Sequence, residues 1–301
     1  MSKRSLALKK RLRAGETTYG CWLSFSNVNV AEILAGTGFD WVLIDTEHGP
    51  FGLEGLQHCL AAFNGSKTVP IVRVPWNDAV RIKQILDLGA DGVLVPMVNS
   101  VAEAEAAVSA CKYPPEGTRG FGPRRASDYG RSTDDYVAQA NEGTIVMLQI
   151  EHIKAVDDVD AILAVPGIDV ICLGPTDLSG SLGLLRQFTH PKVAAAVDKV
   201  IARASAKGLP VCAGVAFPPD VMKDWVAKGA NFVLTMEDST MFRQGASNAL
   251  ATMRSEIAAA QRAARKAAKS AKRTSPPVRE ASRSGGRAAA GEVKRGSAKR
   301  R

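Results

Sequence analysis

Eight short segments in the first part of the chain are dense in Val, Ile, Leu and aromatic side chains, and a longer segment of mixed polarity follows most of them. These eight segments are almost continuously apolar rather than strictly alternating, which is typical of parallel strands buried on both faces. We predict strands over residues 18–25, 39–45, 69–74, 91–97, 144–151, 169–174, 210–216 and 231–236.

The intervening segments show helical spacing of their apolar positions, as in residues 79–89 and 101–112. Many of them end at a glycine just before the next strand, and glycine is the residue that most readily ends a helix. Strand-then-helix units repeated eight times predict an α/β fold of the (β/α)₈ TIM-barrel type, with residues 1–260 as one domain. Nucleotide-binding folds lose support, because no GxGxxG joins the first strand and helix and no GxxxxGK[ST] occurs. The glycines are Gly36, Gly38, Gly89, Gly167, Gly208 and Gly229.

The composition indicates a globular protein and a cytoplasmic location. Hydrophobic residues make up 46% and charged residues 23% of the 301 residues, as in ordinary globular proteins. The chain has no apolar run long enough for a membrane span, and its basic first residues lack the apolar core of a secretory signal. Its five cysteines are widely spaced without a CxxC pair, which indicates reduced thiols. We therefore expect a cytoplasmic protein that does not bind membranes.

The positive charge is concentrated at the C-terminus. The net charge of the chain is +9, but residues 261–301 hold 14 Lys or Arg against two Glu, a local net charge of +12, which leaves −3 for the first 260 residues. This segment is rich in Ala, Ser and Gly and cannot bury enough apolar surface to offset its ordering entropy. We predict a basic low-complexity tail over 261–301, disordered after Thr274 and helical at most before it. The tail is either a solubilising extension or a weak, non-specific contact for nucleic acid.

In barrels of this type the active site lies at the carboxyl ends of the strands. The predicted strands end near several carboxylates, one imidazole and one guanidinium, a combination suited to a small anionic substrate and a metal ion. Arg73 within an apolar strand has no obvious structural reason to be buried. The candidate side chains are Asp45, His48, Arg73, Gln149, Glu151, Thr176 and Asp177.

The predicted strands contain no lysine, so a Schiff base formed on a barrel strand is not expected. Carbonyl chemistry would then need another electron sink, and a divalent metal held by carboxylates supplies one. Glu151 and Asp177, at neighbouring strand ends, are the predicted ligands of Mg²⁺ or Mn²⁺, with Co²⁺ a further candidate. The same residues have plainer interpretations: Glu151 could form a structural ion pair, and Asp177 could cap the helix that follows.

Five motifs occur in order along residues 5–255: FDWVLIDTEHGP, WNDAVRIKQILDLGADGVLVPMV, YPPEGTRGFGPRRAS, LQIE and GPTDLSGSLG. Together they resemble the metal-dependent pyruvate aldolases of the HpcH/HpaI family. The resemblance implies a (β/α)₈ barrel that forms a homo-trimer or homo-hexamer by exchanging a C-terminal helix. It also implies a divalent metal on Glu151 and Asp177, and a small 2-oxo acid substrate whose carboxylate binds backbone amides near Thr176 and Asp177.

The remaining roles also follow from that resemblance. Arg73 matches the arginine that stabilises an enolate oxygen, and His48, oriented by Asp45, matches an acid/base pair. Asp87 matches a carboxylate supplied to the site of a neighbouring subunit. Separately, Gln149 shares a strand side with Glu151 and could touch substrate.

Three functions stay open at this stage. The first is a class II aldolase, an aldehyde-lyase that cleaves 4-hydroxy-2-oxo acids reversibly to pyruvate and an aldehyde. The second is a related metal-enolate enzyme, either an oxaloacetate decarboxylase or a lyase acting on citrate or malyl-CoA. The third is a barrel whose basic tail binds nucleic acid, against which the −3 charge of the first 260 residues counts.

Overall fold

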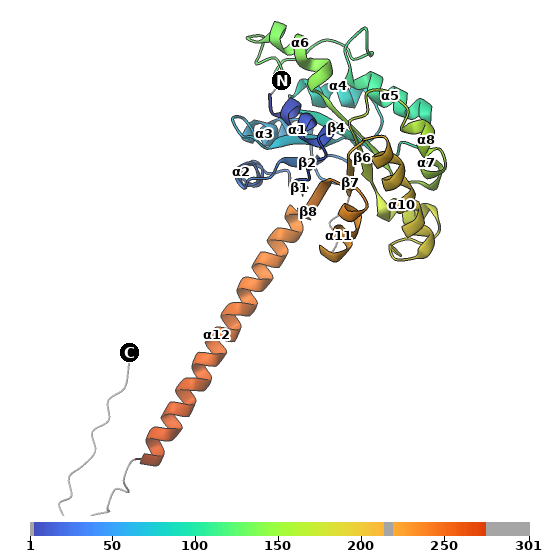
Figure 1. Ribbon diagram of the computed structural model, residues 1–301. Helices are drawn as coiled ribbons and strands as arrows, with labels where there is room; N and C mark the ends of the chain where they lie inside the picture. Colours follow the sequence, from blue (N-terminus) through green and yellow to red (C-terminus); the bar gives the residue numbers. More distant parts are fainter. Residues whose placement is uncertain (1–2, 214–218, 275–301) are drawn as a thin grey trace, which may run out of the picture. The chain divides into compact units, whose positions relative to one another are not determined.

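The computed structural model describes residues 3–213 and 219–274. The chain divides into a compact unit, Met1–Gly245, and a second unit, Ala246–Arg301. The first unit is a closed barrel of eight parallel strands in the order β1 to β8, with helices around it (Figure 1). The predicted TIM-barrel fold is therefore confirmed.

All eight predicted strands are present, and over the described residues most are one to three residues shorter than predicted. Residues 214–216, the end of the seventh predicted strand, lie outside the described part of the chain. The strands are β1 (Thr18–Leu23), β2 (Trp41–Asp45), β3 (Val69–Arg73), β4 (Gly92–Val95), β5 (Ile145–Ile150), β6 (Val170–Leu173), β7 (Val211–Ala213) and β8 (Phe232–Glu237).

The helices follow the strands as the apolar spacing indicates, and most connecting glycines adopt the left-handed backbone that ends a helix. The helices of the described residues are α1 (Lys3–Arg13), α2 (Val28–Gly36), α3 (Leu53–Ala62), α4 (Ala79–Asp87), α5 (Val101–Cys111), α6 (Thr133–Gly143), α7 (Ile153–Asp157), α8 (Val159–Ile162), α9 (Pro175–Ser181), α10 (Pro191–Ala206), α11 (Pro219–Ala227) and α12 (Asp238–Thr274).

Alternation along each strand divides the core into two layers. In β2, Trp41 and Leu43 belong to the cluster inside the barrel, whereas Val42 and Ile44 pack in the layer between strands and helices. Both layers are apolar, so the strands read as continuous hydrophobic runs. Inside the barrel, the Trp41 ring stacks on Phe232 with 3.9 Å between ring centroids. Gly20 faces this stack, since any side chain there would overlap Trp41.

Helix α1 was not predicted from the sequence, and it closes the amino-terminal end of the barrel. Its Leu8 and Leu12 are buried in the cluster inside the barrel. The ammonium of Lys9 lies 2.8 Å from an oxygen of Asp169 and donates to the carbonyl oxygens of Glu142 and Thr144. A buried lysine is tolerated here because all these oxygens surround it. With this end closed, the cavity that remains lies at the carboxyl ends of the strands.

The second unit is described over Ala246–Thr274, which forms the distal part of α12. The helical stretch predicted for 261–273 is confirmed. The predicted disorder after Thr274 falls outside the described residues, and the predicted domain boundary at residue 260 stays a prediction. Among residues 3–213 and 219–274, no helix is both long enough and apolar enough to cross a membrane.

Replacing Gly20 with alanine should destabilise the barrel. The new Cβ would lie 2.2 Å from the Trp41 ring and 2.4 Å from its carbonyl oxygen. We expect Gly20→Ala to lower the free energy of unfolding by about 2 kcal/mol, the cost of overpacking a tight core, measured by urea denaturation. The control is Gly36→Ala at the end of α2, where a Cβ meets nothing within 4 Å. Equal stability of the two variants would contradict the packing described here.

Candidate active site

Polar side chains gather around a cavity of about 430 Å³ at the carboxyl ends of the strands. The structure brings together six of the predicted residues in its wall, and Glu151 lies just beneath it against Gly174. Several lining residues were not among those predictions, notably Trp22 and those at the end of β8 and the start of α12. The lining residues are Trp22, Asp45, His48, Arg73, Gln149, Gly174, Thr176, Asp177, Met236, Glu237 and Thr240.

Arg73 is held rigidly by Asp45. The two residues are register partners at the ends of β2 and β3, so both side chains emerge at the same level of the barrel. Nε of Arg73 donates to Oδ1 of Asp45 at 2.9 Å, and one terminal nitrogen donates to Oδ2 at 2.6 Å. Burial by itself would lower the pKa of Arg73, but the hydrogen bond and charge of Asp45, together with Glu47, leave that pKa raised. Arg73 is therefore a permanent, fixed cation.

Trp22 and Glu47 complete the surroundings of this guanidinium. Its carbon lies 4.4 Å from the centre of the Trp22 ring, a cation–π contact from β1. Its other terminal nitrogen lies 3.1 Å from Oε2 of Glu47. With one flat face covered and three nitrogens engaged, the guanidinium has little freedom to rotate.

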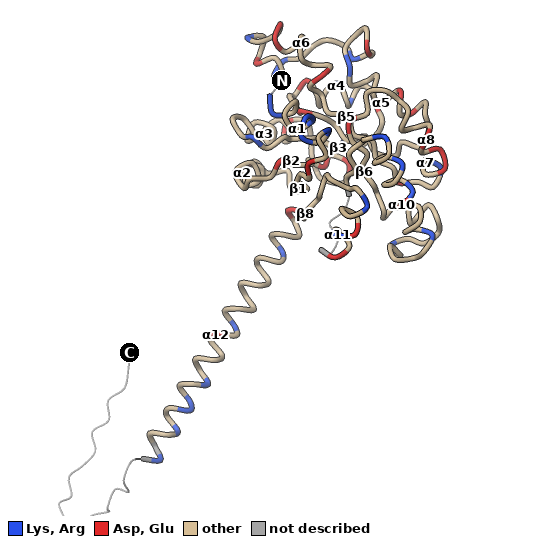
Figure 2. The backbone as a smooth tube through the Cα atoms, in the orientation of Figure 1, with Lys and Arg blue, Asp and Glu red and all other residues tan. Residues whose placement is uncertain are grey.

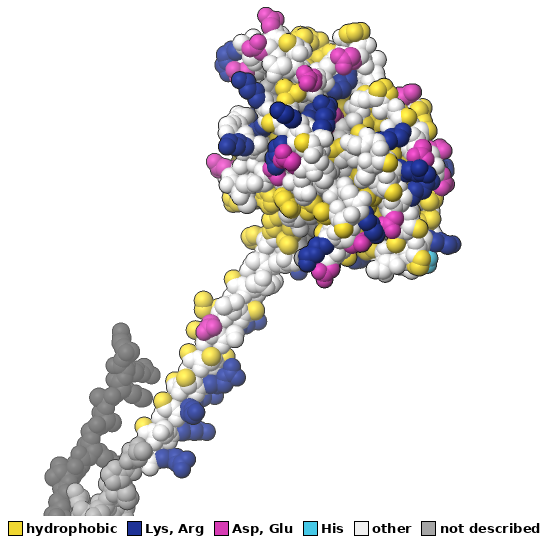
Figure 3. Space-filling model, viewed as in Figure 1, with side chains coloured by type: hydrophobic (Ala, Val, Ile, Leu, Met, Phe, Trp, Pro, Cys, Tyr) yellow, Lys and Arg dark blue, Asp and Glu magenta, His cyan; other side chains and the backbone are white. Residues whose placement is uncertain are grey.

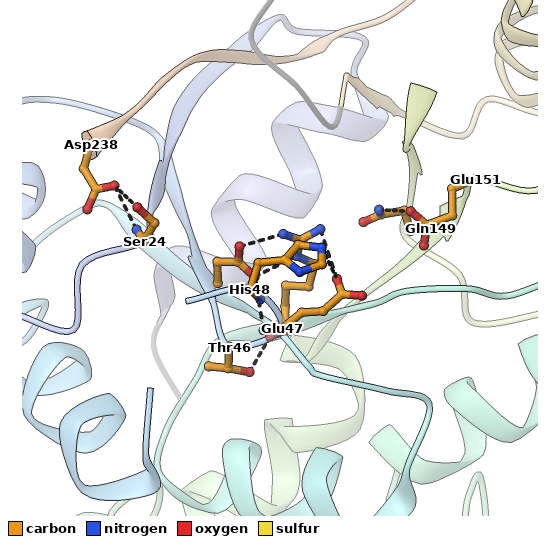
Figure 4. Close-up of polar contacts among 9 residues, drawn as sticks. Ser24, Thr46, Glu47, His48, Gln149, Glu151 and Asp238 are labelled. Carbon is orange, nitrogen blue, oxygen red and sulfur yellow. Dashed lines mark hydrogen bonds and ion pairs between the residues drawn. The ribbon is translucent and has the colours of Figure 1, made fainter. Parts of the chain in front are cut away.

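The predicted contact between the Asp45 carboxylate and the His48 ring is replaced by a contact between that carboxylate and the His48 backbone N–H. Oδ1 of Asp45 accepts hydrogen bonds from the backbone N–H groups of Glu47 and His48, at 3.1 and 3.2 Å. Arg73 donates hydrogen bonds to both carboxylate oxygens of Asp45, and the His48 imidazole lies near Glu47 instead. The His48 side chain is 68% exposed, and its Nε2 lies 3.8 Å from Oε2 of Glu47. Asp45 thus orients the turn that carries His48, while Glu47 faces the ring (Figure 4).

Glu47 is a site residue that the sequence interpretation left aside. Burial raises the pKa of Glu47, and the carboxylates of Asp45 and Asp177 add to that rise, while Arg73 and His48 oppose it. Its position between the guanidinium and the imidazole links two candidate catalytic groups. Its place in the turn directly after β2, at the carboxyl end of the strand, is the signal that could have revealed it.

Glu151 lies at the bottom of the site and is only 3% exposed. Its Oε1 accepts a 2.7 Å hydrogen bond from the backbone N–H of Met97, and its Oε2 accepts one from the amide of Gln149. Met97 adopts a positive φ of 54°, rare for a residue with a side chain, at the point where its N–H reaches the carboxylate. Gln149 is therefore a direct partner of Glu151.

The surroundings of Glu151 match a cation site. Burial raises the pKa of Glu151 to about 7, against the hydrogen bonds of Met97 and Gln149, and the charges of Asp177 and Glu47 raise it further. Gly174 leaves room for this carboxylate, because a Cβ there would lie 2.5 Å from Oε2 of Glu151. Crowded, desolvated carboxylates of this kind are stabilised by a bound cation.

Glu151 and Asp177 offer two carboxylate ligands, fewer than a cage made by protein alone. The described residues contain no group of three or more His, Cys, Asp and Glu placed to hold a metal. Two carboxylates suit a hard divalent ion that keeps its other positions for water and substrate oxygens. Asp177 and Thr176 lie in the first turn of α9, beside Gly174.

Asp87 lies outside this cavity. It ends α4, at the side of the barrel away from the carboxyl ends of the strands, and its Oδ1 accepts a 2.6 Å hydrogen bond from Arg119. The Arg119 guanidinium is buried and lies 4.5 Å from the Tyr113 ring centre. Any contact of Asp87 with an active site would therefore involve a second copy of the chain.

The fold and the site define a class: a (β/α)₈-barrel enzyme with a fixed arginine, the buried carboxylate of Glu151 and the exposed carboxylate of Asp177 at the carboxyl ends of its strands. The family model of the HpcH/HpaI aldolase/citrate lyase family matches residues 18–245. The chain belongs to this family, as its motifs predicted.

Named relatives support the same assignment. The chain is 43% identical to a hydroxypyruvate/pyruvate aldolase of Roseobacter denitrificans, over 77% of this chain and 91% of that protein. It is 42% identical to a 4-hydroxy-2-oxovalerate aldolase of Novosphingobium aromaticivorans, over 84% and 96% of the two chains. A solved HpcH/HpaI aldolase/citrate lyase family protein from Burkholderia cenocepacia superposes with a TM-score of 0.79 at 33% identity, covering 82% and 99%.

Removing one partner of the Asp45–Arg73 pair should cost far more than removing both. Asp45→Ala leaves a buried guanidinium without its main counter-charge, and we expect it to lower the free energy of unfolding by about 3–5 kcal/mol. The double variant Asp45→Leu/Arg73→Met, which removes both charges, should stay within about 2 kcal/mol of the parent protein. Urea unfolding measures both.

The control for this experiment is Arg131→Ala, which breaks a surface pair with Asp128. Solvent screens that pair, so its loss should leave the unfolding free energy unchanged. A double variant as unstable as Asp45→Ala would show that packing, rather than charge pairing, dominates at this position.

Proposed function

We propose that this chain is a carbon–carbon lyase, an aldolase that reversibly cleaves 4-hydroxy-2-oxo acids to pyruvate and an aldehyde. The observation that carries the proposal is a cavity whose wall holds the fixed Arg73 and the exposed carboxylate of Asp177, with the buried carboxylate of Glu151 just beneath. Aldol cleavage of such acids generates an enolate, and fixed positive charge at its oxygen is usually the largest contribution to catalysis. The names of the relatives agree with this reaction class.

The chain's residues fit a divalent metal on Glu151 and Asp177, with Mg²⁺ or Mn²⁺ preferred and Co²⁺ a further candidate. When bound, the ion would supply Lewis-acid stabilisation of the substrate's keto oxygen. Gln149 and Met97 hold Glu151 in the orientation that this requires.

Arg73 supplies charge stabilisation from the protein itself. Its position is set by Asp45, Glu47 and Trp22, so it needs no reorganisation when negative charge develops on the substrate. The backbone amides of Thr176 and Asp177 lie at the start of α9, where helical N–H groups have no partners within the helix. They are the proposed site for the substrate carboxylate.

His48 is the proposed proton acceptor for the 4-hydroxyl group. It is exposed at the mouth of the cavity and can reach a substrate entering there. An imidazole can both accept and donate a proton, which suits proton transfer. In this geometry Glu47, rather than Asp45, is the carboxylate that faces the ring and stabilises its charged form.

A complete site would include Asp87 of a neighbouring subunit, in a homo-trimer or homo-hexamer. The second unit of the chain exposes Leu250, Met253 and Ile257 along α12, at spacings of three and four residues. An exposed apolar stripe of this kind is typical of an interface, and helix exchange between subunits would cover it. The five cysteines are buried and none forms a disulfide, in keeping with the proposed cytoplasmic location.

Oxaloacetate decarboxylation is a proposed side reaction, because it passes through the same pyruvate enolate. A lyase acting on citrate or malyl-CoA is the alternative assignment within the family. Contact of the basic C-terminal segment with nucleic acid is a separate proposal, since the barrel that carries the reaction has a net charge of −3.

The reaction is tested with a panel of 4-hydroxy-2-oxo acids of different chain length and terminal charge, with coupled detection of pyruvate. We expect pyruvate formation that stops with EDTA and returns with Mg²⁺ or Mn²⁺. Arg73→Lys, which keeps a cation beside Asp45 but loses its two-point geometry, should lower kcat about 100-fold. Turnover that persists without metal, or turnover of CoA thioesters alone, would contradict the proposal.

The metal site has its own test. Gly174→Ala places a Cβ 2.5 Å from Oε2 of Glu151, so the carboxylate must move. We expect Mn²⁺ affinity, measured by electron paramagnetic resonance, to fall at least about tenfold, as for changes to groups that orient metal ligands. Gly180→Ala in the same helix is the control, since its Cβ meets only a Leu185 methyl group at 3.3 Å. Equal Mn²⁺ affinity in the two variants would place the metal elsewhere.

A further inference from the structure

Residues 246–274 of α12 form a helix whose surface is almost entirely exposed. Every side chain described there is exposed except that of Ala258, which is half-buried. The stretch contains seven Lys or Arg and a single acidic residue, Glu256. From residue 257 to residue 274 it has no acidic residue at all. This part of the helix therefore carries a concentrated positive charge that no carboxylate of the same helix segment neutralises.

The basic side chains lie on one face of this helix. Arg262, Lys266, Lys269 and Arg273 follow one another at intervals of four, three and four residues, the spacing that stacks side chains along a helix. Arg265 flanks this row. Figure 3 shows Lys and Arg side chains along one side of α12 and hydrophobic side chains, with Ala counted among them, along the opposite side, and Figure 2 marks the Lys and Arg positions on the backbone. We call the five residues the basic face.

The residues between these charges are mostly alanines. Ala263, Ala264, Ala267 and Ala268 give the helix high intrinsic propensity and a slim profile. At a rise of about 1.5 Å per residue the basic face is about 17 Å long. A slim, positively charged helix can approach a row of phosphates closely along that whole length.

The side chains of the basic face favour double-stranded DNA over a membrane surface or double-stranded RNA. Helices that bind membrane surfaces need a large apolar face opposite the charges, and after Ile257 this helix has neither an aromatic nor a branched apolar side chain. The major groove of B-form DNA is about 12 Å wide and admits an α-helix, whereas that of A-form RNA is too narrow. Lys and Arg set among alanines neutralise phosphates without reading bases.

We infer that the basic face, Arg262, Arg265, Lys266, Lys269 and Arg273, binds the phosphates of double-stranded DNA without sequence preference. The barrel does not share in this contact, because its net charge of −3 repels phosphate. The inference is independent of the proposed lyase activity, since none of the five residues lies in the active-site cavity.

The test uses the full chain and a variant in which the five residues become glutamine, which keeps the helical propensity and removes the charge. The control variant changes five exposed basic residues of the barrel, Lys67, Lys154, Lys192, Lys207 and Lys223, to glutamine. Each protein is titrated against a labelled 24-base-pair DNA duplex, the matching RNA duplex and vesicles with anionic lipid, from 0.05 to 0.3 M salt. Pyruvate formation and circular dichroism are measured in parallel.

We expect the parent and the control to bind the DNA duplex with a steep salt dependence. The basic-face variant should bind it on the order of 100-fold more weakly at 0.1 M salt, and its slope of log affinity against log salt should fall by about 3 to 4. Pyruvate formation should be the same in all three proteins.

Two results would overturn the inference. One is a basic-face variant whose DNA affinity and salt slope match those of the control, which would place binding in residues 275–301 or in the barrel. The other is a parent protein that prefers the anionic vesicles or the RNA duplex to DNA, with the preference lost in the basic-face variant. Helical content equal to that of the parent excludes unfolding of α12 as the cause of any loss.

Discussion

The ion pair between Asp45 and Arg73 is the interaction on which the candidate site depends. It exists because β2 and β3 pair in a register that sets these two residues side by side, at the last position of each strand. A guanidinium that is only 9% exposed costs free energy unless its donors are paired, and the two oxygens of Asp45 pair two of them. The same carboxylate also holds the backbone of the turn that carries His48. Asp45 thus fixes both the guanidinium of Arg73 and the backbone that carries His48.

The charges around this pair explain why the site suits a cation as well as an anion. Asp45 and Glu47 face Arg73, so the single guanidinium is already surrounded by negative charge. Glu151 lies deeper, with its pKa raised by burial, and its hydrogen bonds from Met97 and Gln149 hold it in place without neutralising it. A divalent ion at Glu151 and Asp177 would offset the charge of those two carboxylates, so that the ion and Arg73 would be the positive groups facing an anionic 2-oxo acid.

The strands and most of the site could be predicted from sequence because both follow from local rules. Continuous apolar runs identify buried parallel strands, and barrel topology then places every strand end at one rim. The partner of each side chain could not be predicted, since it depends on register and on competition for the same oxygens. Asp45 was expected to orient the His48 ring, yet the buried Arg73 offers two strong hydrogen bonds and takes the carboxylate. Helix α1 was missed because its two buried leucines stand among basic residues, whose charge hides the short apolar stripe.

Charge is the property for which the whole-chain value misleads most. A net charge of +9 describes neither part of this chain, since the first 260 residues carry −3 and residues 261–301 carry +12. An acidic barrel is no obstacle to binding an anionic substrate, because the potential inside a small cavity is set by the nearest fixed groups rather than by the distant surface. The opposite holds for the basic face of α12, where every side chain is in water and only a dense array of charges attracts a polyanion strongly. Burial thus divides the charged groups of this chain into two kinds: a few desolvated groups surround the cavity, and many solvated groups make up the basic face.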